Sequence, residues 1–146
     1  MNASSKTQQS AQWLGYLGLI PFLGAGLLLT NISRELILTG IHSYAAIILT
    51  FIGAIHWGRA ISTDTGDSQA WLIIISITPS LVAWLSLFLQ PLYGLPTLIA
   101  AFLLLLAFDY KQYRDLHWFR RLRVQLTSTV CLILLFCLFL TGEATI

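Results

Sequence analysis

Three ionisable side chains at the ends of apolar stretches are the residues of this chain best suited to chemistry. His56 and Arg59 lie three residues apart, which puts both on one face of a helix. Asp109 ends a long apolar run and is expected on the same side of the membrane. Together these groups could relay protons, or bind an anionic headgroup or a quinone ring. The favoured interpretation is structural: these side chains form a salt bridge that caps one end of a bundle of helices.

Sequence signatures of catalysis are absent. The chain has no glycine-rich phosphate loop, no His or Cys set with metal-ligand spacing, and no GxSxG or HExxH motif. Hydroxyl side chains within the apolar runs are expected to bond to their own backbone or to a neighbouring helix. We therefore expect a protein without catalytic activity, metal or cofactor. Nucleic-acid binding is not expected either, because it would need a soluble module.

Long stretches without charge indicate that the chain lies in a membrane. Of its 146 residues, 57 % are apolar and 10 % are charged, which is typical of a polytopic membrane protein. Residues 68–108 contain no Asp, Glu, Lys or Arg. As one helix they would be on the order of 60 Å long, about twice the hydrocarbon core of a bilayer. They must fold back, and the prolines and glycine of residues 90–96 mark the turn.

The expected fold is an all-α bundle of five transmembrane helices in a single domain, residues 1–146. The helices are predicted at residues 12–30, 41–61, 70–89, 94–109 and 123–141, with a basic cytoplasmic loop at 110–122. Trp13 and Pro21 recur as Trp71 and Pro79 at an offset of 58, which suggests a parallel two-helix repeat followed by a fifth helix. Pro21 and Pro79 are candidate hinges, although a static bundle is favoured.

The distribution of positive charge predicts the orientation. In a five-helix arrangement seven of the eight Lys and Arg fall on one side, and only Arg34 falls on the other. Because positively charged short loops are retained in the cytoplasm, we expect the amino terminus inside and the carboxyl terminus outside. Neither a cleavable signal peptide nor a mitochondrial transit peptide is apparent, which favours a multi-pass protein of the bacterial inner membrane.

The basic loop is expected to lie on the membrane surface. Its cations suit anionic lipid headgroups, and specific docking of a partner protein is the less favoured alternative. The residues concerned are Lys111, Arg114, Arg120, Arg121 and Arg123.

Small residues recur at every fourth position of the helix predicted at 41–61. This ridge consists of Ala46, Thr50, Ala54, Gly58 and Ser62. A ridge of small side chains lets another helix approach closely. We expect an interface there, with a helix of the same chain favoured over another protein. His42 and Tyr44, toward the outer end of the same helix, are expected to be interfacial residues.

Three segments carry a resemblance to a known family. They are Leu14-Gly15-Tyr16-Leu17-Gly18-Leu19-Ile20-Pro21-Phe22, then His56-Trp57-Gly58, then Trp118-Phe119 leading into residues 122–127. In this order and spacing the chain resembles, over nearly its whole length, the family typified by transmembrane protein 69, domain of unknown function 3429. The resemblance implies a small integral protein of bacterial inner membranes with relatives in mitochondria, and it implies no catalytic residues.

Together these observations favour a non-catalytic accessory or assembly subunit of a larger membrane complex. The respiratory chain is the leading expectation for that complex, because the resemblance joins bacterial and mitochondrial energy-transducing membranes. The alternative is a small transporter or a lipid- or quinone-binding protein that uses His56, Arg59 and Asp109.

Overall fold

The apolar runs fold into α-helices. The computed structural model describes residues 3–28, 33–62 and 70–143, and every regular element in these ranges is an α-helix. In chain order they are α1 (Ala3–Leu17), α2 (Ile20–Leu28), α3 (Arg34–Ser62), α4 (Ala70–Ser86), α5 (Pro91–Gln112) and α6 (His117–Glu143). Three of them, α3, α5 and α6, are long and apolar enough to cross a membrane, and α4 is a shorter apolar helix. The prediction of an all-helical membrane protein is confirmed, and the five-helix plan fits if α1 and α2 count as one.

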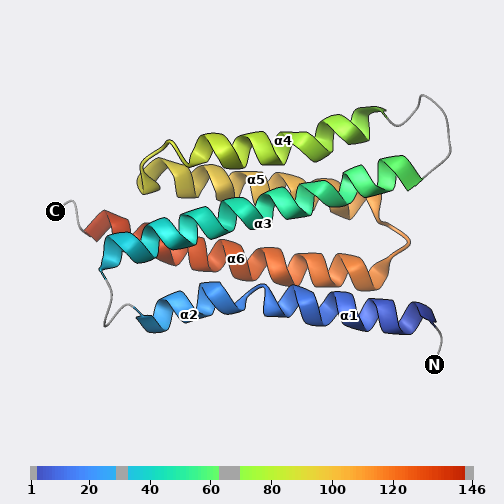
Figure 1. Cartoon of the computed structure of the whole chain (residues 1–146), viewed down its shortest axis with the longest axis horizontal. Helices are drawn as coiled ribbons and strands as arrows, with labels where there is room; N and C mark the ends of the chain where they lie inside the picture. The colour runs from blue at the N-terminus through green and yellow to red at the C-terminus, as the bar shows by residue number, and fades with distance from the viewer. Residues whose placement is uncertain (1–2, 29–32, 63–69, 144–146) are drawn as a thin grey trace.

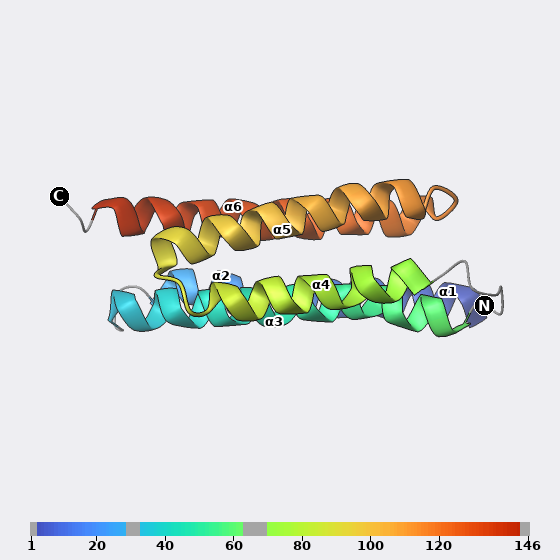
Figure 2. The same cartoon turned by 90° about the horizontal axis from the view of Figure 1, so that it is seen from above.

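The helices run alternately in opposite directions and form two layers. One layer holds α5 and α6, and the other holds α3, α4 and the α1–α2 pair (Figures 1 and 2). The closest pairs are the hairpins α3–α4 and α5–α6, whereas α1 and α2 meet the others more sparsely. At one end of the bundle α1 begins, α3 ends and α5 connects to α6. We call this the basic end, since seven of the eight Lys and Arg belong to the segments that meet there.

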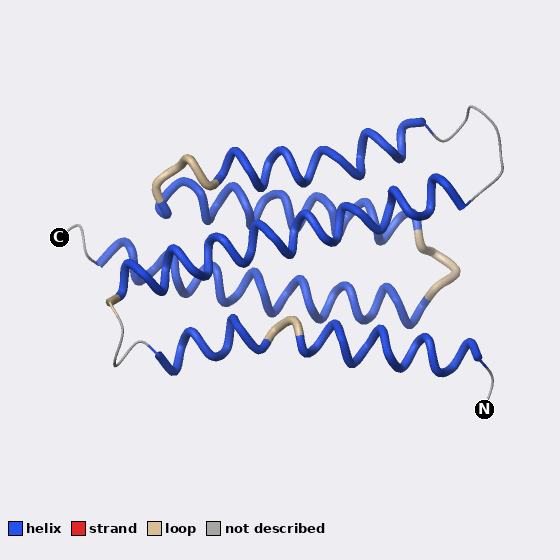
Figure 3. The backbone as a smooth tube through the Cα atoms, in the orientation of Figure 1, coloured by secondary structure: helices blue, strands red, loops and turns tan. Residues whose placement is uncertain are grey.

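The first predicted span is broken instead of kinked. The helix ends at Leu17 and begins again at Ile20, and Figure 3 shows the short loop between the two parts. Pro21 explains the break, because a proline has no N–H to bond to the carbonyl of Leu17 and its ring would clash there. In the first turn of α2 the missing donor costs nothing. The Tyr44 hydroxyl of α3 donates a 2.9 Å hydrogen bond to the Gly18 carbonyl that the break exposes.

Several helices are longer than predicted. α1 includes the polar residues before position 12, α3 begins at Arg34, and α6 begins at His117. These turns contain helix-forming polar residues that a search for apolar spans passes over. Consequently the expected loop of residues 110–122 shortens to residues 113–116. The proposed two-helix repeat is also unequal in form, since Pro21 follows a helix break while Pro79 lies inside α4.

The close approach on α3 occurs at Gly53 and not along the predicted ridge. A Cβ atom added at Gly53 would lie 2.8 Å from the Ser76 carbonyl oxygen and 3.1 Å from the Pro79 ring. Of the ridge, Ala46 is buried, whereas the other four residues are exposed. A Cβ at Gly58 would have nothing within 4 Å. The expectation of a neighbour within the chain therefore fails for Gly58, because α4 packs on a different face of α3.

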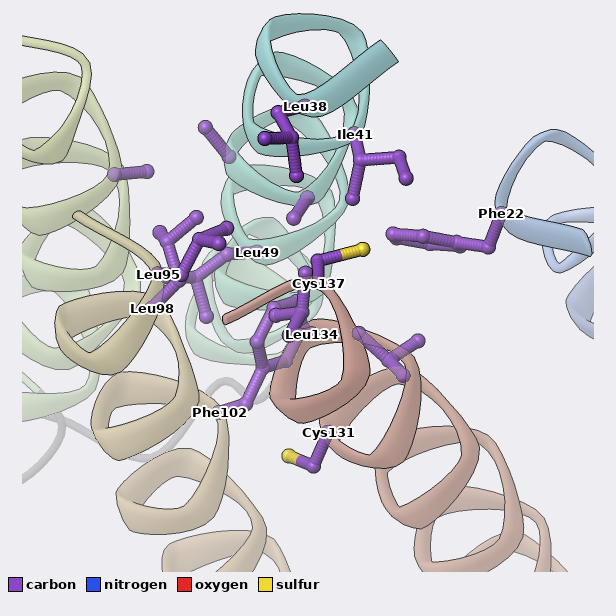
Figure 4. Close-up of a cluster of buried hydrophobic side chains, with 14 of the residues drawn as sticks. Phe22, Leu38, Ile41, Leu49, Leu95, Leu98, Phe102, Cys131, Leu134 and Cys137 are labelled. Atoms are coloured by element: carbon purple, nitrogen blue, oxygen red, sulfur yellow. The ribbon is translucent and has the colours of Figure 1, made fainter. Parts of the chain in front are cut away.

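The apolar core lies where α3, α5 and α6 meet. Leu49, Leu95, Leu98 and Leu134 are fully buried, and Phe22 reaches the same cluster from α2 (Figure 4). Cys131 and Cys137 are free thiols buried in this cluster. The core fixes the three long helices relative to one another, and thereby fixes the polar residues that they carry toward the basic end.

Candidate functional site

Asp109 lies at the centre of a buried ion-pair cluster near the basic end. His56 comes from α3, Asp109 from α5 and Arg123 from α6, and their exposed fractions are 1 %, 2 % and 4 %. Arg123 Nε donates a hydrogen bond to Asp109 Oδ2 at 2.6 Å. His56 Nε2 lies 3.0 Å from Asp109 Oδ1, which is ion-pair distance, although the two atoms are not aligned as a hydrogen bond. We call His56, Asp109 and Arg123 the buried cluster.

Aromatic rings enclose the imidazole of His56. Tyr113 Oη lies 3.4 Å from His56 Nδ1, and the Phe108 ring meets the imidazole edge to face with centroids 5.1 Å apart. Burial raises the pKa of the Tyr113 phenol above its ordinary value, with Arg59 acting in the opposite direction. The phenol therefore stays protonated and can donate to Nδ1. The phenol and the Asp109 carboxylate thus face the two ring nitrogens of His56.

The structure divides the predicted polar cluster. It brings His56 and Asp109 together, but the guanidinium carbon of Arg59 lies over the Tyr113 ring, 4.8 Å from its centroid. The cation that pairs with Asp109 is Arg123. The placement of Arg123 in a lipid- or partner-facing loop is therefore wrong, because α6 begins early enough to carry this residue into the interior.

The other basic residues lie nearer the surface. Lys111, Arg114 and Arg121 are exposed. The guanidinium of Arg120 lies 3.7 Å from the centroid of the Tyr110 ring. Arg121 lines a hollow of about 330 Å³ together with Gln125 of α6 and with side chains of α1.

A larger cavity of about 500 Å³ adjoins the buried cluster. It lies between the α1–α2 pair and helices α3, α5 and α6, and aromatic rings such as Phe22, Phe51 and Phe119 form part of its apolar wall. Apart from the indole of Trp118, its lining has two polar side chains, Arg123 and Thr127. Small-molecule sites in proteins commonly have this size and this composition.

Two buried donors beside this cavity lack partners. Arg123 Nη2 and Thr127 Oγ1 form no hydrogen bond with any described residue, and Thr127 is 2 % exposed. A buried polar group without a partner loses its hydration and gains nothing in exchange. Such atoms next to a hollow are the places where a ligand's polar group would be stabilised. The sequence gives no signal for Thr127, because it is one of three neighbouring hydroxyl residues, with Ser128 and Thr129.

A second polar pair lies toward the opposite end of the bundle. His42 Nε2 lies 3.3 Å from Ser86 Oγ, and the Ser86 hydroxyl donates to the Ala83 carbonyl at 2.7 Å. His42 is buried, so its expected interfacial position is wrong. Gly94 lies against the His42 ring, where a Cβ atom would clash. This pair is tightly packed between α3, α4 and α5, and it serves helix packing.

The buried cluster has no features of a metal site. Among the described residues no three His, Cys, Asp or Glu side chains come together as possible ligands. The carboxylate of Asp109 is already in contact with two nitrogen-bearing side chains. Through its contact with Asp109, the buried cluster holds Arg123 in a fixed position beside the apolar cavity.

Comparison with known proteins places most of the chain in one family. Residues 7–139 match the family model described as "Protein of unknown function (DUF3429)". Over 137 residues the chain is 31 % identical to "Transmembrane protein 69" of Xenopus tropicalis, covering 87 % of this chain and 53 % of that protein. The chain thus spans about half the length of this relative. No solved structure matches this chain.

Proposed function

We propose that this chain, which belongs to the family described as "Protein of unknown function (DUF3429)", binds a long apolar molecule within the membrane. The observation that carries the proposal is the cavity of about 500 Å³ whose apolar lining includes two buried polar side chains, Arg123 and Thr127. A few polar groups in an apolar pocket are what orients a ligand. A lipid, or a quinone with a hydrocarbon tail, has the matching division into an apolar body and a polar head.

In this proposal the protein holds or carries its ligand and catalyses no reaction. Asp109 fixes Arg123 through Nε, while Nη2 has no hydrogen-bond partner among the described residues. His56 meets the other oxygen of Asp109, and Tyr113 in turn contacts His56. The buried cluster then acts as a positioning device, because a guanidinium held in one geometry loses less conformational entropy on binding than a free one.

Retention of a ligand tests this function. The full chain, purified from its native membrane in mild detergent, is extracted and the small molecules are identified by mass spectrometry. Ala11 lines the cavity, so Ala11→Phe should fill it and remove the bound molecule. Ala100→Phe is the matched control, since Ala100 is exposed on α5. Equal recovery of the molecule from wild type and from Ala11→Phe would refute binding in the cavity.

A second candidate is the accessory or assembly subunit of a membrane complex, with the respiratory chain as the leading choice. The observation that favours it is the outward position of Thr50, Ala54, Gly58 and Ser62 on α3. A helix of another protein could pack closely on such a face. This candidate needs no catalysis and no ligand.

Co-purification tests the second candidate. We expect a stoichiometric partner to be lost when Gly58→Leu places a bulky side chain in the open space there. Gly40→Leu is the matched control, because Gly40 lies on the same helix and has nothing within 4 Å of an added Cβ. Retention of every partner in both variants would exclude the ridge as the interface.

For the location we infer the bacterial inner membrane, with the basic end in the cytoplasm. The retention of positive loops on that side supports this orientation. Alkaline phosphatase fused after residue 143 should then be active, and phosphatase inserted at residues 113–116 should be inactive. Activity at 113–116 would reverse the orientation.

A further inference from the structure

We infer that the ligand of the cavity beside the buried cluster carries an uncharged carbonyl oxygen at the end of its hydrocarbon, and that this oxygen accepts hydrogen bonds from Arg123 Nη2 and Thr127 Oγ1. This inference rests on the proposed function and names its class of ligand. Two observations carry it: the unusual state of the Thr127 hydroxyl and the charge balance of the cluster.

The hydroxyl of Thr127 differs from those of four other helical threonines in this chain. Thr50, Thr78, Thr97 and Thr129 each donate to the backbone carbonyl four residues earlier, at 2.8–3.0 Å. Within a membrane this local bond is the ordinary way to satisfy a hydroxyl group. Thr127 is buried and lacks any such bond among the described residues. Its donor is therefore left without a partner at the wall of the cavity.

Arg123 and Thr127 are four residues apart on α6, so their side chains lie on the same face of the helix. Both residues line the cavity. A guanidinium N–H and a hydroxyl can both donate to one oxygen or to two neighbouring oxygens. The missing partner is thus a hydrogen-bond acceptor, and the apolar lining around it calls for a hydrocarbon body.

The pairing of Arg123 with Asp109 favours a neutral acceptor over an anionic one. The positive charge of Arg123 is already matched by Asp109 at 2.6 Å. The next cation, Arg59, lies over the Tyr113 ring. A ligand carboxylate or phosphate beside Arg123 would add a second negative charge to a region where His56, Asp109 and Arg123 are all nearly inaccessible. Burying an unmatched charge is strongly unfavourable, whereas a carbonyl oxygen accepts the same hydrogen bonds without one.

Two natural sources provide a carbonyl oxygen on a hydrocarbon, namely an acyl ester and a quinone. Both share the recognition chemistry, so the experiment compares one probe of each with an anion of equal length. The probes are methyl oleate, a benzoquinone with a decyl tail, and oleate. Each is titrated at pH 7.5 into the purified full chain in detergent, and native mass spectrometry measures the number of probe molecules bound per chain.

We expect at least one carbonyl probe to bind with one-to-one stoichiometry, and about tenfold more tightly than oleate. The preference between methyl oleate and the quinone then identifies the source. Thr127→Val keeps the side-chain shape and should weaken binding of the preferred probe about fivefold, the effect of one hydrogen bond. Thr127→Ser should restore binding. Thr129→Val is the matched control, since that hydroxyl bonds to the Gln125 carbonyl.

Arg123→Lys tests the second donor separately. The lysine keeps a cation beside Asp109 but has no counterpart of Nη2, so the preferred probe should again bind more weakly. Thermal unfolding of each variant identifies any that fails to fold, and Thr127→Val changes the side chain only by replacing the hydroxyl with a methyl group.

The possible failures are distinct. Oleate that binds as tightly as methyl oleate and the quinone would overturn the inference of an uncharged head, while leaving the cavity as a ligand site. Unchanged binding in Thr127→Val and Arg123→Lys would also overturn it. If no probe binds, or if Ala11→Phe leaves binding intact, the proposed function itself fails.

Discussion

Asp109 and Arg123 form a 2.6 Å hydrogen-bonded ion pair across the α5–α6 hairpin, and both residues are almost completely buried. In low dielectric each charge depends on the other, because neither is hydrated. The carboxylate also faces His56, so three helices meet at one side chain. Stability and site geometry are therefore linked at Asp109.

Replacing Asp109 by Asn should destabilise the bundle more than any surface change. The variant leaves Arg123 charged and buried without a counter-ion, a loss of about 3–5 kcal/mol. Thermal unfolding in detergent measures it. The double variant Asp109→Asn with Arg123→Met removes both charges and should recover much of the loss. A double variant no more stable than Asp109→Asn alone would contradict this account.

Gly53 and Gly58 should respond in opposite ways to the same substitution. Gly53→Ala places a methyl group 2.8 Å from the Ser76 carbonyl oxygen and should destabilise the bundle by about 1–3 kcal/mol. Gly58→Ala meets open space, and the higher helix propensity of alanine should leave stability equal or slightly higher. The two melting temperatures form a matched pair, and equal values would show that α4 does not approach α3 at Gly53.

Tyr44→Phe should lower the free energy of unfolding by about 1 kcal/mol, the usual net value of one hydrogen bond. The hydroxyl satisfies the Gly18 carbonyl at the break between α1 and α2. The aromatic contact with Phe22, at a centroid distance of 4.9 Å, remains in the variant. Faster hydrogen exchange around Gly18 should accompany the loss. Unchanged exchange there would mean that the bond does not hold the break in place.

Gly94→Ala should lower the melting temperature, because the added methyl group would clash with the His42 ring and lie 3.0 Å from the Ser86 carbonyl oxygen. Adding His42→Ala should restore part of the loss by removing the ring. The rest should persist, since the backbone of α4 cannot retreat as easily as a side chain. If the effects of the two substitutions on the melting temperature simply add, this contact is absent.

The helices and their order were predictable because absence of charge is a strong signal. Residues 68–108 had to form a hairpin, and α4 and α5 do. The break at Gly18 was not predictable to the residue. A proline in an apolar helix can kink it or end it, and here the outcome depends on Tyr44, which is distant in sequence and can satisfy the exposed carbonyl.

The candidate site was predictable only in part. His56 and Asp109 stood out because ionisable residues beside apolar runs are rare. The sequence groups Arg123 with the loop because its apolar pattern predicts a helix from position 123, six residues after α6 begins at His117. A signal for the pair did exist, since Asp109 and Arg123 are the charges nearest the apolar parts of two consecutive helices. Thr127 needed the structure, because what distinguishes it is a missing bond.

The contact of Gly53 with Pro79 bears on how the bundle moves. The proline ring rests against the glycine of the neighbouring helix, so bending α4 at Pro79 would open the close contact between α3 and α4 at Gly53. These two helices should therefore move as one rigid body, and Pro79 should not act as a hinge. The α1–α2 pair forms one wall of the cavity, meets the other helices sparsely and is interrupted at Gly18. Sideways displacement of this pair is the motion that would admit a molecule from the surrounding lipid.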